Sequence, residues 1–169
     1  LQEASYWMWC SIRWTYSNKL YDGIVTMRFE GKTDLERESI AIKKFLSIFN
    51  GSAEKLGPHD IDYKIFDKEG NAICYAEVKG RLYNIEDAYP LPIAARKLVK
   101  LVDKDLVGVI IWACRDGIIC GQPSKLKGTV RYGGRTPRPG AANDQEIIIY
   151  YDKQIDLREW KIDQTTKNS

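Results

Sequence analysis

Two short segments of the chain carry acidic and basic side chains at spacings that suit a charged site. Asp62 lies near the start of one apolar run, and Glu77, Val78 and Lys79 lie at the end of the next. Side chains two residues apart leave the same face of a strand, so Glu77 and Lys79 point the same way. A further carboxylate, Glu38, lies upstream in a segment with a helical pattern. Carboxylates and an ammonium would then converge where the interior of a sheet normally holds apolar groups.

The chemistry that these groups suit is that of a hard divalent cation. Carboxylate oxygens suit Mg²⁺, with Mn²⁺ as a substitute, and Mg²⁺ is commonly held by one or two carboxylates together with phosphate oxygens of a substrate. Asp62, Glu77 and the backbone carbonyl of Val78 fit the role of ligands. A metal there lowers the pKa of a bound water and offsets charge on a phosphate during in-line attack. Lys79 would orient or help deprotonate that water or stabilise the transition state, and Glu38 would bind the metal through water or help place a second ion.

A predicted hairpin brings the two segments together. The apolar runs at residues 61–66 and 72–78 flank the polar residues 67–71, in which Gly70 can supply the positive φ that such a connection needs. One strand therefore folds back beside the other. The pairing places the start of the first strand, with its carboxylate, close to the end of the second.

A helix is predicted upstream of the hairpin, from Thr33 or Asp34 as N-cap to about residue 50. Its apolar stripe is formed by Leu35, Ile42, Phe45 or Leu46, and Phe49. Glu38 falls on this stripe, and two interpretations remain open. In the first, Glu38 lies at the edge of the stripe and reaches water. In the second, which the neighbouring hairpin favours, it faces the other carboxylates.

The remaining elements complete an α/β pattern. After a loop at residues 80–92 we expect a helix at 93–102, a buried strand at 107–113, a turn at 116–117, a strand at 118–121, a loop at 125–140 and a strand at 146–151. This order predicts a mixed central sheet of about four to five strands flanked by helices.

Length and composition describe one ordinary globular domain. The chain has 169 residues, 44% of them hydrophobic, and a formal net charge of +3, which indicates only weak general compatibility with a polyanionic partner. We expect neither a signal peptide nor a membrane span, because no stretch approaches about 18 continuous apolar residues. The four cysteines lack a close metal-binding spacing. We therefore expect free thiols and a cytoplasmic location, in the host cell if the protein is viral.

The N-terminal residues 1–26 are rich in Trp and Tyr and differ from the rest of the chain. We expect Met27 to be the natural start, with residues 1–26 translated from upstream of it. A fragment of a longer protein is one alternative, and an aromatic strand or helix packed on the domain is another. Residues 27–163 then form a single domain, and residues 164–169 form a polar tail.

At these residues the chain resembles the PD-(D/E)XK nuclease superfamily, the restriction-endonuclease-like fold. The order helix, strand, strand, helix matches over residues 33–121, and so do Glu38 with Ile42 and Phe45, Asp62, and Glu77-Val78-Lys79. The resemblance implies a restriction-endonuclease-like core with a four-stranded mixed sheet between helices. It also implies Mg²⁺-dependent cleavage of DNA or sometimes RNA. The resemblance further suggests a homodimer, because enzymes of this fold are often dimers.

The sequence departs from the family's pattern at the Pro-Asp pair. Pro58 is followed by His59 and Asp60, so the proline is displaced from the aspartate at the start of the strand. We assign Asp62 as the metal ligand because it directly precedes the alternating strand. Asp60 is the alternative.

Other basic residues are candidates for contacts with nucleic-acid phosphates: Arg81, Arg96, Lys97, Arg131, Arg135 and Arg138. The ordinary explanation for the pair at 96–97 is the exposed face of an amphipathic helix. The last three residues lie in a segment rich in Gly and Pro, and the ordinary explanation there is a mobile connection.

The combined pattern favours a metal-dependent endonuclease that hydrolyses phosphodiester bonds, in DNA more than RNA, with a metal-activated water. A glutamate and a lysine two apart near a strand end usually form a solvated pair, but the whole ordered series is much less expected by chance. One alternative is a nucleic-acid-binding module of the same fold that does not cut. Another is an ion-pair cluster in an unrelated enzyme, which predicts that Glu38 lies far from Asp62 and Glu77.

Overall fold

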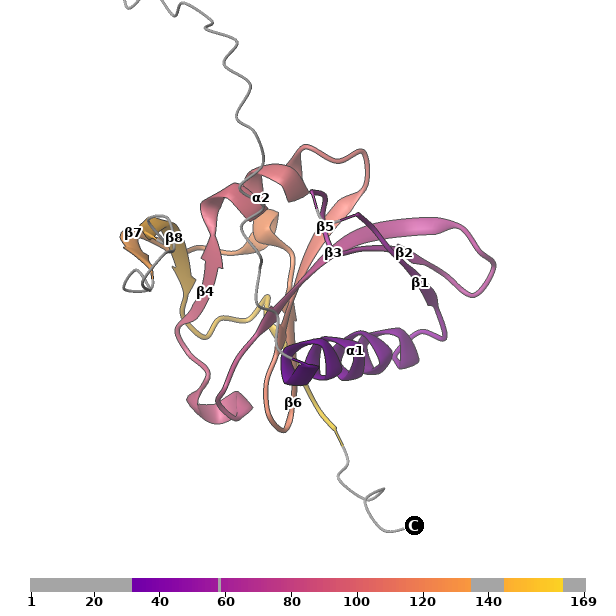
Figure 1. The fold of residues 1–169 in the computed structure, drawn as a ribbon, viewed down its shortest axis with the longest axis horizontal. Coiled ribbons are helices and arrows are strands. Elements are labelled where there is room, and N and C mark those ends of the chain that lie inside the picture. Colours follow the sequence, from indigo (N-terminus) through magenta and orange to yellow (C-terminus); the bar gives the residue numbers. More distant parts are fainter. Residues whose placement is uncertain (1–31, 58, 135–144, 163–169) are drawn as a thin grey trace, which may run out of the picture.

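A six-stranded mixed sheet lies at the centre of the fold. The computed structural model describes residues 32–57, 59–134 and 145–162. The sheet has the order β1 (Ser52–Lys55), β2 (Tyr63–Phe66), β3 (Ala72–Gly80), β5 (Val107–Ala113), β6 (Gly117–Gly121) and β9 (Arg158–Lys161). A second, three-stranded sheet has the order β4 (Leu91–Ala94), β8 (Gln145–Tyr151) and β7 (Thr129–Gly134) (Figure 1).

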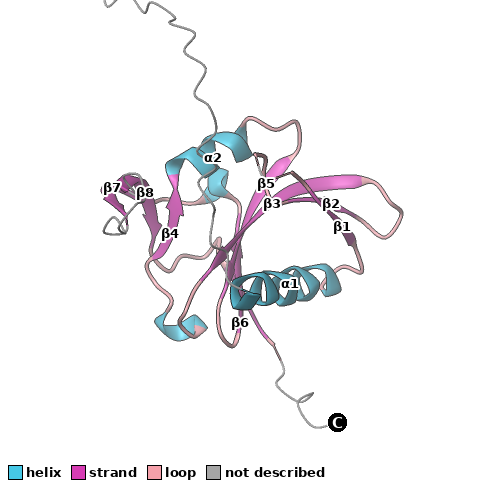
Figure 2. Ribbon diagram, viewed as in Figure 1, coloured by secondary structure: helices cyan, strands magenta, loops and turns pink. Residues whose placement is uncertain are grey.

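The described helices are α1 (Lys32–Ser47) and α2 (Ala95–Val102), with short 3-10 turns at Ile85–Asp87 and Pro123–Lys125. Helix α1 packs on the central strands β3, β5 and β6, and α2 contacts β3 and β5 as well as the second sheet. The two helices lie on opposite sides of the central sheet (Figure 2). The arrangement is the expected α/β one, with six strands in the mixed sheet rather than four to five.

Two hydrophobic clusters mark the two faces of the central sheet. The cluster under α1 includes Ala41, Ile42, Ile65, Ala76 and Ile111. The cluster on the other face, under α2 and the second sheet, includes Tyr75, Leu91, Leu101, Ile110 and Trp112. Because successive side chains of a strand point to opposite faces, Glu77 follows Tyr75 and lies on the α2 face.

The pairing of β3 with β5 is parallel, and the other central strands pair antiparallel. A parallel pair cannot be joined by a tight turn, so the chain between these strands must cross the face of the sheet. The crossing segment contains β4 and α2. From Val109 onward β5 is buried, as expected for a strand covered on both faces.

The hairpin of β2 and β3 confirms the prediction from the sequence. The strands pair antiparallel with Tyr63 opposite Ala76. The connection turns at Gly70, whose φ of 87° is open to glycine at no steric cost. The apolar stripe predicted for the first helix is confirmed at Ile42, which is buried, and is wrong at Leu35, which is exposed.

Several elements differ from the prediction. Residues 93 and 94 belong to β4 and not to the second helix, because Leu91 and Ile93 alternate inward as strand residues. Part of the loop expected at residues 125–140 is strand β7, whose side chains are mostly exposed and therefore show no apolar alternation. The sequence pattern does not predict strands β1 and β9, because both are short, polar edge strands.

The expectation of free thiols is confirmed for the cysteines that the structure describes. Cys74, Cys114 and Cys120 are free and buried, and Cys10 lies outside the described residues. In the part of the chain that the structure describes, no helix is both long and apolar enough to cross a membrane. The segments 1–26 and 164–169 also lie outside that part.

The packing of α2 against the central sheet gives a testable prediction. Leu101 is 1% exposed and lies over Gly108 of β5, where an added Cβ would come within 2.4 Å of the Leu101 Cγ. We expect Leu101→Ala to lower the free energy of unfolding by about 2–5 kcal/mol, because it leaves a cavity under the helix. Val102→Ala is the control, since Val102 is 67% exposed and should change stability by less than about 0.5 kcal/mol. Urea unfolding measures both, and equal effects would show that α2 is not anchored through Leu101.

Candidate active site

Asp62 and Glu77 lie together at one end of the hairpin. Tyr63 pairs with Ala76, so one residue further along Asp62 comes opposite Glu77. The backbone N–H of Val78 donates to Asp62 Oδ2 at 2.8 Å, which fixes the orientation of this carboxylate. The N–H and C=O of a strand residue face the same neighbouring strand, so the Val78 carbonyl also faces the side of Asp62.

Glu77 is the one charged residue among the described residues that is fully buried, with 4% of its surface exposed. Its Oε1 accepts a hydrogen bond from Lys97 Nζ at 2.6 Å. Its Oε2 is buried and accepts no hydrogen bond from any described group. A buried carboxylate oxygen in this condition is unfavourable and points to a missing partner.

Burial raises the pKa of the Glu77 carboxyl to about 7, and the negative charge of Asp62 adds to the rise. The hydrogen bond and the charge of Lys97 oppose this effect, and the charge of Lys79 opposes it more weakly. Lys79 lies two residues after Glu77, on the same face of β3, and its side chain is exposed. The two lysines therefore supply the positive charge near the carboxylate pair.

Lys97 is predicted to contact phosphates, with the exposed face of its helix as the ordinary explanation, and the structure places it beside Asp62 and Glu77. Its side chain is 12% exposed, and its Nζ lies 3.8 Å from Asp62 Oδ1 in addition to the bond to Glu77. A signal for this position existed in the sequence. Lys97 precedes the apolar Leu101 by four residues, so both lie on the same face of the helix.

Glu38 is not brought into this group. It extends from α1, on the face of the sheet opposite to Glu77, and pairs with Lys55 Nζ of β1 at 3.1 Å. The described residues contain no cluster of three or more His, Cys, Asp or Glu side chains placed to hold a metal. The Glu38 side chain is 17% exposed. This position agrees with the first interpretation, a residue at the edge of the apolar stripe, and a role at the metal stays a prediction.

Asp60 and Asp62 have different partners. Asp60 Oδ1 pairs with Lys104 Nζ at 2.6 Å and accepts a hydrogen bond from the N–H of Ile61 at 2.7 Å. The hydrogen bond from Lys104 contributes most to holding the pKa of Asp60 below its ordinary value. Asp60 is thus engaged outside the carboxylate pair, whereas Asp62 lies beside Glu77. This geometry favours Asp62 as the ligand.

The residues predicted to contact phosphates lie at separate places. Arg81 donates to the carbonyl of Ala88 and stacks over Tyr83, so it holds the loop that follows β3. The ion pair of Arg96 with Glu146 links α2 to β8, with Nε and Oε2 2.7 Å apart.

Arg131 is exposed on β7, with its guanidinium 5.6 Å from the centre of the Tyr150 ring. Arg135 and Arg138 lie outside the described residues. Of the predicted contact residues in the described part of the chain, Arg131 is thus exposed and pairs with no described carboxylate.

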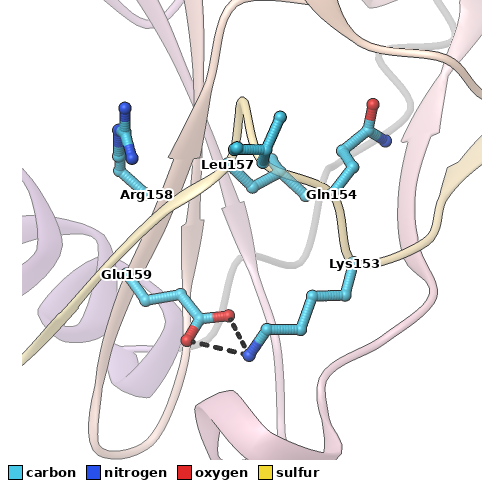
Figure 3. Close-up of a pocket in the computed structure, with 6 residues that line it drawn as sticks. Lys153, Gln154, Leu157, Arg158 and Glu159 are labelled. Carbon is cyan, nitrogen blue, oxygen red and sulfur yellow. Dashed lines mark hydrogen bonds and ion pairs between the residues drawn. The ribbon is translucent and has the colours of Figure 1, made fainter.

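A shallow hollow elsewhere on the surface is not the site. It is lined by residues 153–155 and 157–159, among them Lys153 and Glu159, whose Nζ and Oε1 are 3.0 Å apart (Figure 3). It lies at the β9 edge of the central sheet, whereas the carboxylates lie at β2 and β3. Its lining carries one carboxylate, that of Glu159, which is already paired with Lys153, and Arg158 adds a further positive charge.

Comparison with protein-family models identifies the family. Residues 25–159 match the model of the family described as "Phage putative PDDEXK endonuclease". The chain therefore belongs to this family and to the PD-(D/E)XK superfamily, and its sheet and helices form a restriction-endonuclease-like core. No curated protein and no solved structure matches the chain. The resemblance inferred from the residues is confirmed, and the interpretation as an unrelated enzyme is wrong.

The raised pKa of Glu77 gives a prediction about stability in the presence of a chelator. In the unfolded chain this carboxyl titrates near 4.5, and in the folded protein near 7. Its favourable contribution is therefore present below about pH 4.5 and is lost as the pH rises through 7. Relative to Glu77→Gln, the wild type should lose up to about 3 kcal/mol of unfolding free energy between pH 5 and pH 8.

Denaturant unfolding at several pH values measures this difference. Glu54→Gln, at an exposed position of β1, is the control and should show no such trend relative to the wild type. A stability difference between wild type and Glu77→Gln that stays constant from pH 5 to pH 8 would contradict the raised pKa.

Proposed function

We propose that the protein is a metal-dependent endonuclease that hydrolyses phosphodiester bonds, in DNA more readily than in RNA. The observation that carries the proposal is the buried carboxylate of Glu77 beside Asp62, with one oxygen that no described group satisfies. The family description as an endonuclease supports the same reaction class.

The donor set fits Mg²⁺, for which Mn²⁺ would substitute. Asp62, directly before β2, and Glu77 of the adjacent β3 offer carboxylate oxygens, and the Val78 carbonyl faces the same side. Hard oxygen donors of this kind suit Mg²⁺, and the unsatisfied Oε2 of Glu77 needs a cationic partner. A cation bound there would acidify a bound water and neutralise charge on the phosphate.

The chain's own residues then have distinct roles. The N–H of Val78 holds Asp62 in a fixed orientation, so this carboxylate is preorganised. Because the pKa of Glu77 is about 7, its carboxyl group is partly protonated near neutral pH. A positive charge beside it favours the ionised form. Lys79, exposed on the same face, is the group we assign to orient the attacking water and to stabilise charge on the phosphate.

Binding of the nucleic-acid backbone requires exposed positive charge. Arg131 supplies it on β7, and the sequence places Arg135 and Arg138 shortly after this strand. Arg81 and Arg96 have bonds within the protein, so we assign them to positioning of the loop and the second sheet. Contacts of this kind supply affinity rather than sequence specificity.

One observation favours a second function, a module that binds nucleic acid without cutting it. Buried acids would be unfavourable without a metal, but Lys97 already neutralises part of the charge of Asp62 and Glu77. The pair can therefore persist in a protein that binds no divalent cation. Cation binding separates the two functions.

Cleavage assays test the main proposal. On a panel of labelled duplex, junction, flap and single-stranded DNA and RNA, the wild type should cleave with Mg²⁺ or Mn²⁺ and not in excess chelator. Asp62→Asn and Lys79→Ala should lower the rate by about 10²–10³-fold or more, because each removes charge stabilisation at the reacting phosphate. Asp60→Asn is the matched control and should stay within about threefold of wild type, since it removes an exposed ion pair.

Equal cleavage by wild type, Asp62→Asn and Lys79→Ala would overturn this assignment of the site. So would full activity in chelator. Loss of activity in Asp60→Asn alone would move the metal ligand from Asp62 to Asp60.

A calorimetric titration tests the non-cleaving alternative. We expect Mn²⁺ to release or absorb heat on binding to the wild type, and the signal to disappear in Glu77→Gln, which replaces a carboxylate ligand by a neutral amide. Glu54→Gln should bind like the wild type. A wild type that binds nucleic acid but neither Mn²⁺ nor Mg²⁺ would favour the binding module.

A further inference from the structure

Lys97 occupies the position between the two carboxylates in which a cation is expected. Its Nζ lies 2.6 Å from Glu77 Oε1 and 3.8 Å from Asp62 Oδ1. The lysine comes from α2 and not from the strands that carry the carboxylates. Its burial, at 12% exposure of the side chain, matches a constituent of the site rather than a surface charge.

Neighbouring lysines have other partners. Lys100 Nζ donates to the carbonyl of His59 at 2.6 Å, and Lys104 Nζ pairs with Asp60. Both contacts are made to residues 59 and 60 and not to the carboxylate pair. Lys97 alone of the three is bonded to the carboxylate pair, so the three lysines differ in role although they follow one another on and after α2.

One ammonium leaves the pair of acids incompletely neutralised. Its hydrogen bond is to Oε1 of Glu77, while Oε2 has no partner in the described part of the chain, and Asp62 lies beyond hydrogen-bond distance. A divalent cation bound to both carboxylates would supply more charge in the same place. The ammonium and the cation would repel each other at this separation, so they cannot both stay. The flexible stem of a lysine allows its head to move away.

We propose that Lys97 is an internal counter-ion, which holds Asp62 and Glu77 in the cation-free protein and is displaced from them when a divalent cation binds. This proposal rests on the proposed function, since it assumes that the site takes Mg²⁺ or Mn²⁺. It makes Lys97 a positioning residue that sets the affinity of the site for the cation. The Lys97 ammonium group neutralises part of the charge of the buried acids before the cation binds. It also competes with the cation for the same carboxylate oxygens.

Lys97→Met tests the competition, because methionine keeps much of the length of the side chain and removes the charge. Mn²⁺ titration by calorimetry, without nucleic acid, should show about tenfold tighter binding to Lys97→Met than to the wild type. In chelator the variant should unfold at a lower temperature than the wild type, and Mn²⁺ should raise that temperature by more. Lys100→Met is the control, which removes the same charge one turn further along α2 and should shift the affinity by less than about twofold.

A purely structural role predicts a different result. Lys97→Met would then be less stable and would bind Mn²⁺ no more tightly than the wild type, and this outcome overturns the proposal. Lys97→Arg restores the positive charge and should return the affinity to within about threefold of wild type. An equally tight Lys97→Arg and Lys97→Met would also overturn it, because the gain would not follow the charge.

A second measurement needs no substitution and covers the case in which Lys97→Met does not fold. Reductive methylation of the wild-type protein, read by peptide mass spectrometry, reports the accessibility of each amine. Addition of Mn²⁺ should increase the modification rate of Lys97 several-fold and leave that of Lys100 unchanged. An unchanged or lower rate at Lys97 in a protein that binds Mn²⁺ would overturn the displacement.

The two proposals fail in different ways. If the wild type binds Mn²⁺ and cleaves, but Lys97→Met binds no more tightly, the counter-ion proposal alone is wrong. If neither the wild type nor Lys97→Met binds a divalent cation, the metal-dependent function is wrong and the counter-ion proposal falls with it.

Discussion

The parallel pairing of β3 with β5 is the constraint on which the rest of the structure depends. Two parallel neighbours cannot be joined by a tight turn, so the chain between them crosses one face of the sheet. This crossing contains β4 and α2, and it covers the face from which Glu77 projects. Glu77 is buried because of that cover, and Lys97 reaches it because the helix carrying it lies there. Burial and charge compensation at the site thus have one topological origin.

The two faces of the central sheet differ in composition and in role. The face under α1 is apolar and contributes stability through packed side chains such as Ile42 and Ile111. The α2 face combines an apolar cluster with the charged group at the end of β2 and β3. A buried ion pair is weak support for stability, because the loss of hydration offsets much of the attraction between the charges. Its presence here is therefore better explained by the chemistry of the site than by folding.

Family membership and the geometry of the side chains give two different kinds of support for the assignment of the site. Family membership covers residues 25–159 and concerns the class of fold and the description as an endonuclease. The geometry concerns individual side chains: it places Asp62 beside Glu77, engages Asp60 with Lys104, and puts Lys97 between the carboxylates. The physical requirements of a buried acid are local and are visible in its partners.

The sequence by itself determined the hairpin, its turn at Gly70, and the convergence of Asp62 with Glu77 and Lys79, because these depend on the two-residue period of strands and on contacts between neighbours in the chain. It also predicted the buried strand at residues 107–113. Only the tertiary structure decided the side of the sheet on which Glu38 lies and the burial of Lys97, since both depend on how distant helices pack. The same holds for the edge strands β1, β7 and β9. Their side chains are mostly exposed, so backbone pairing with a neighbour defines them and no apolar pattern does.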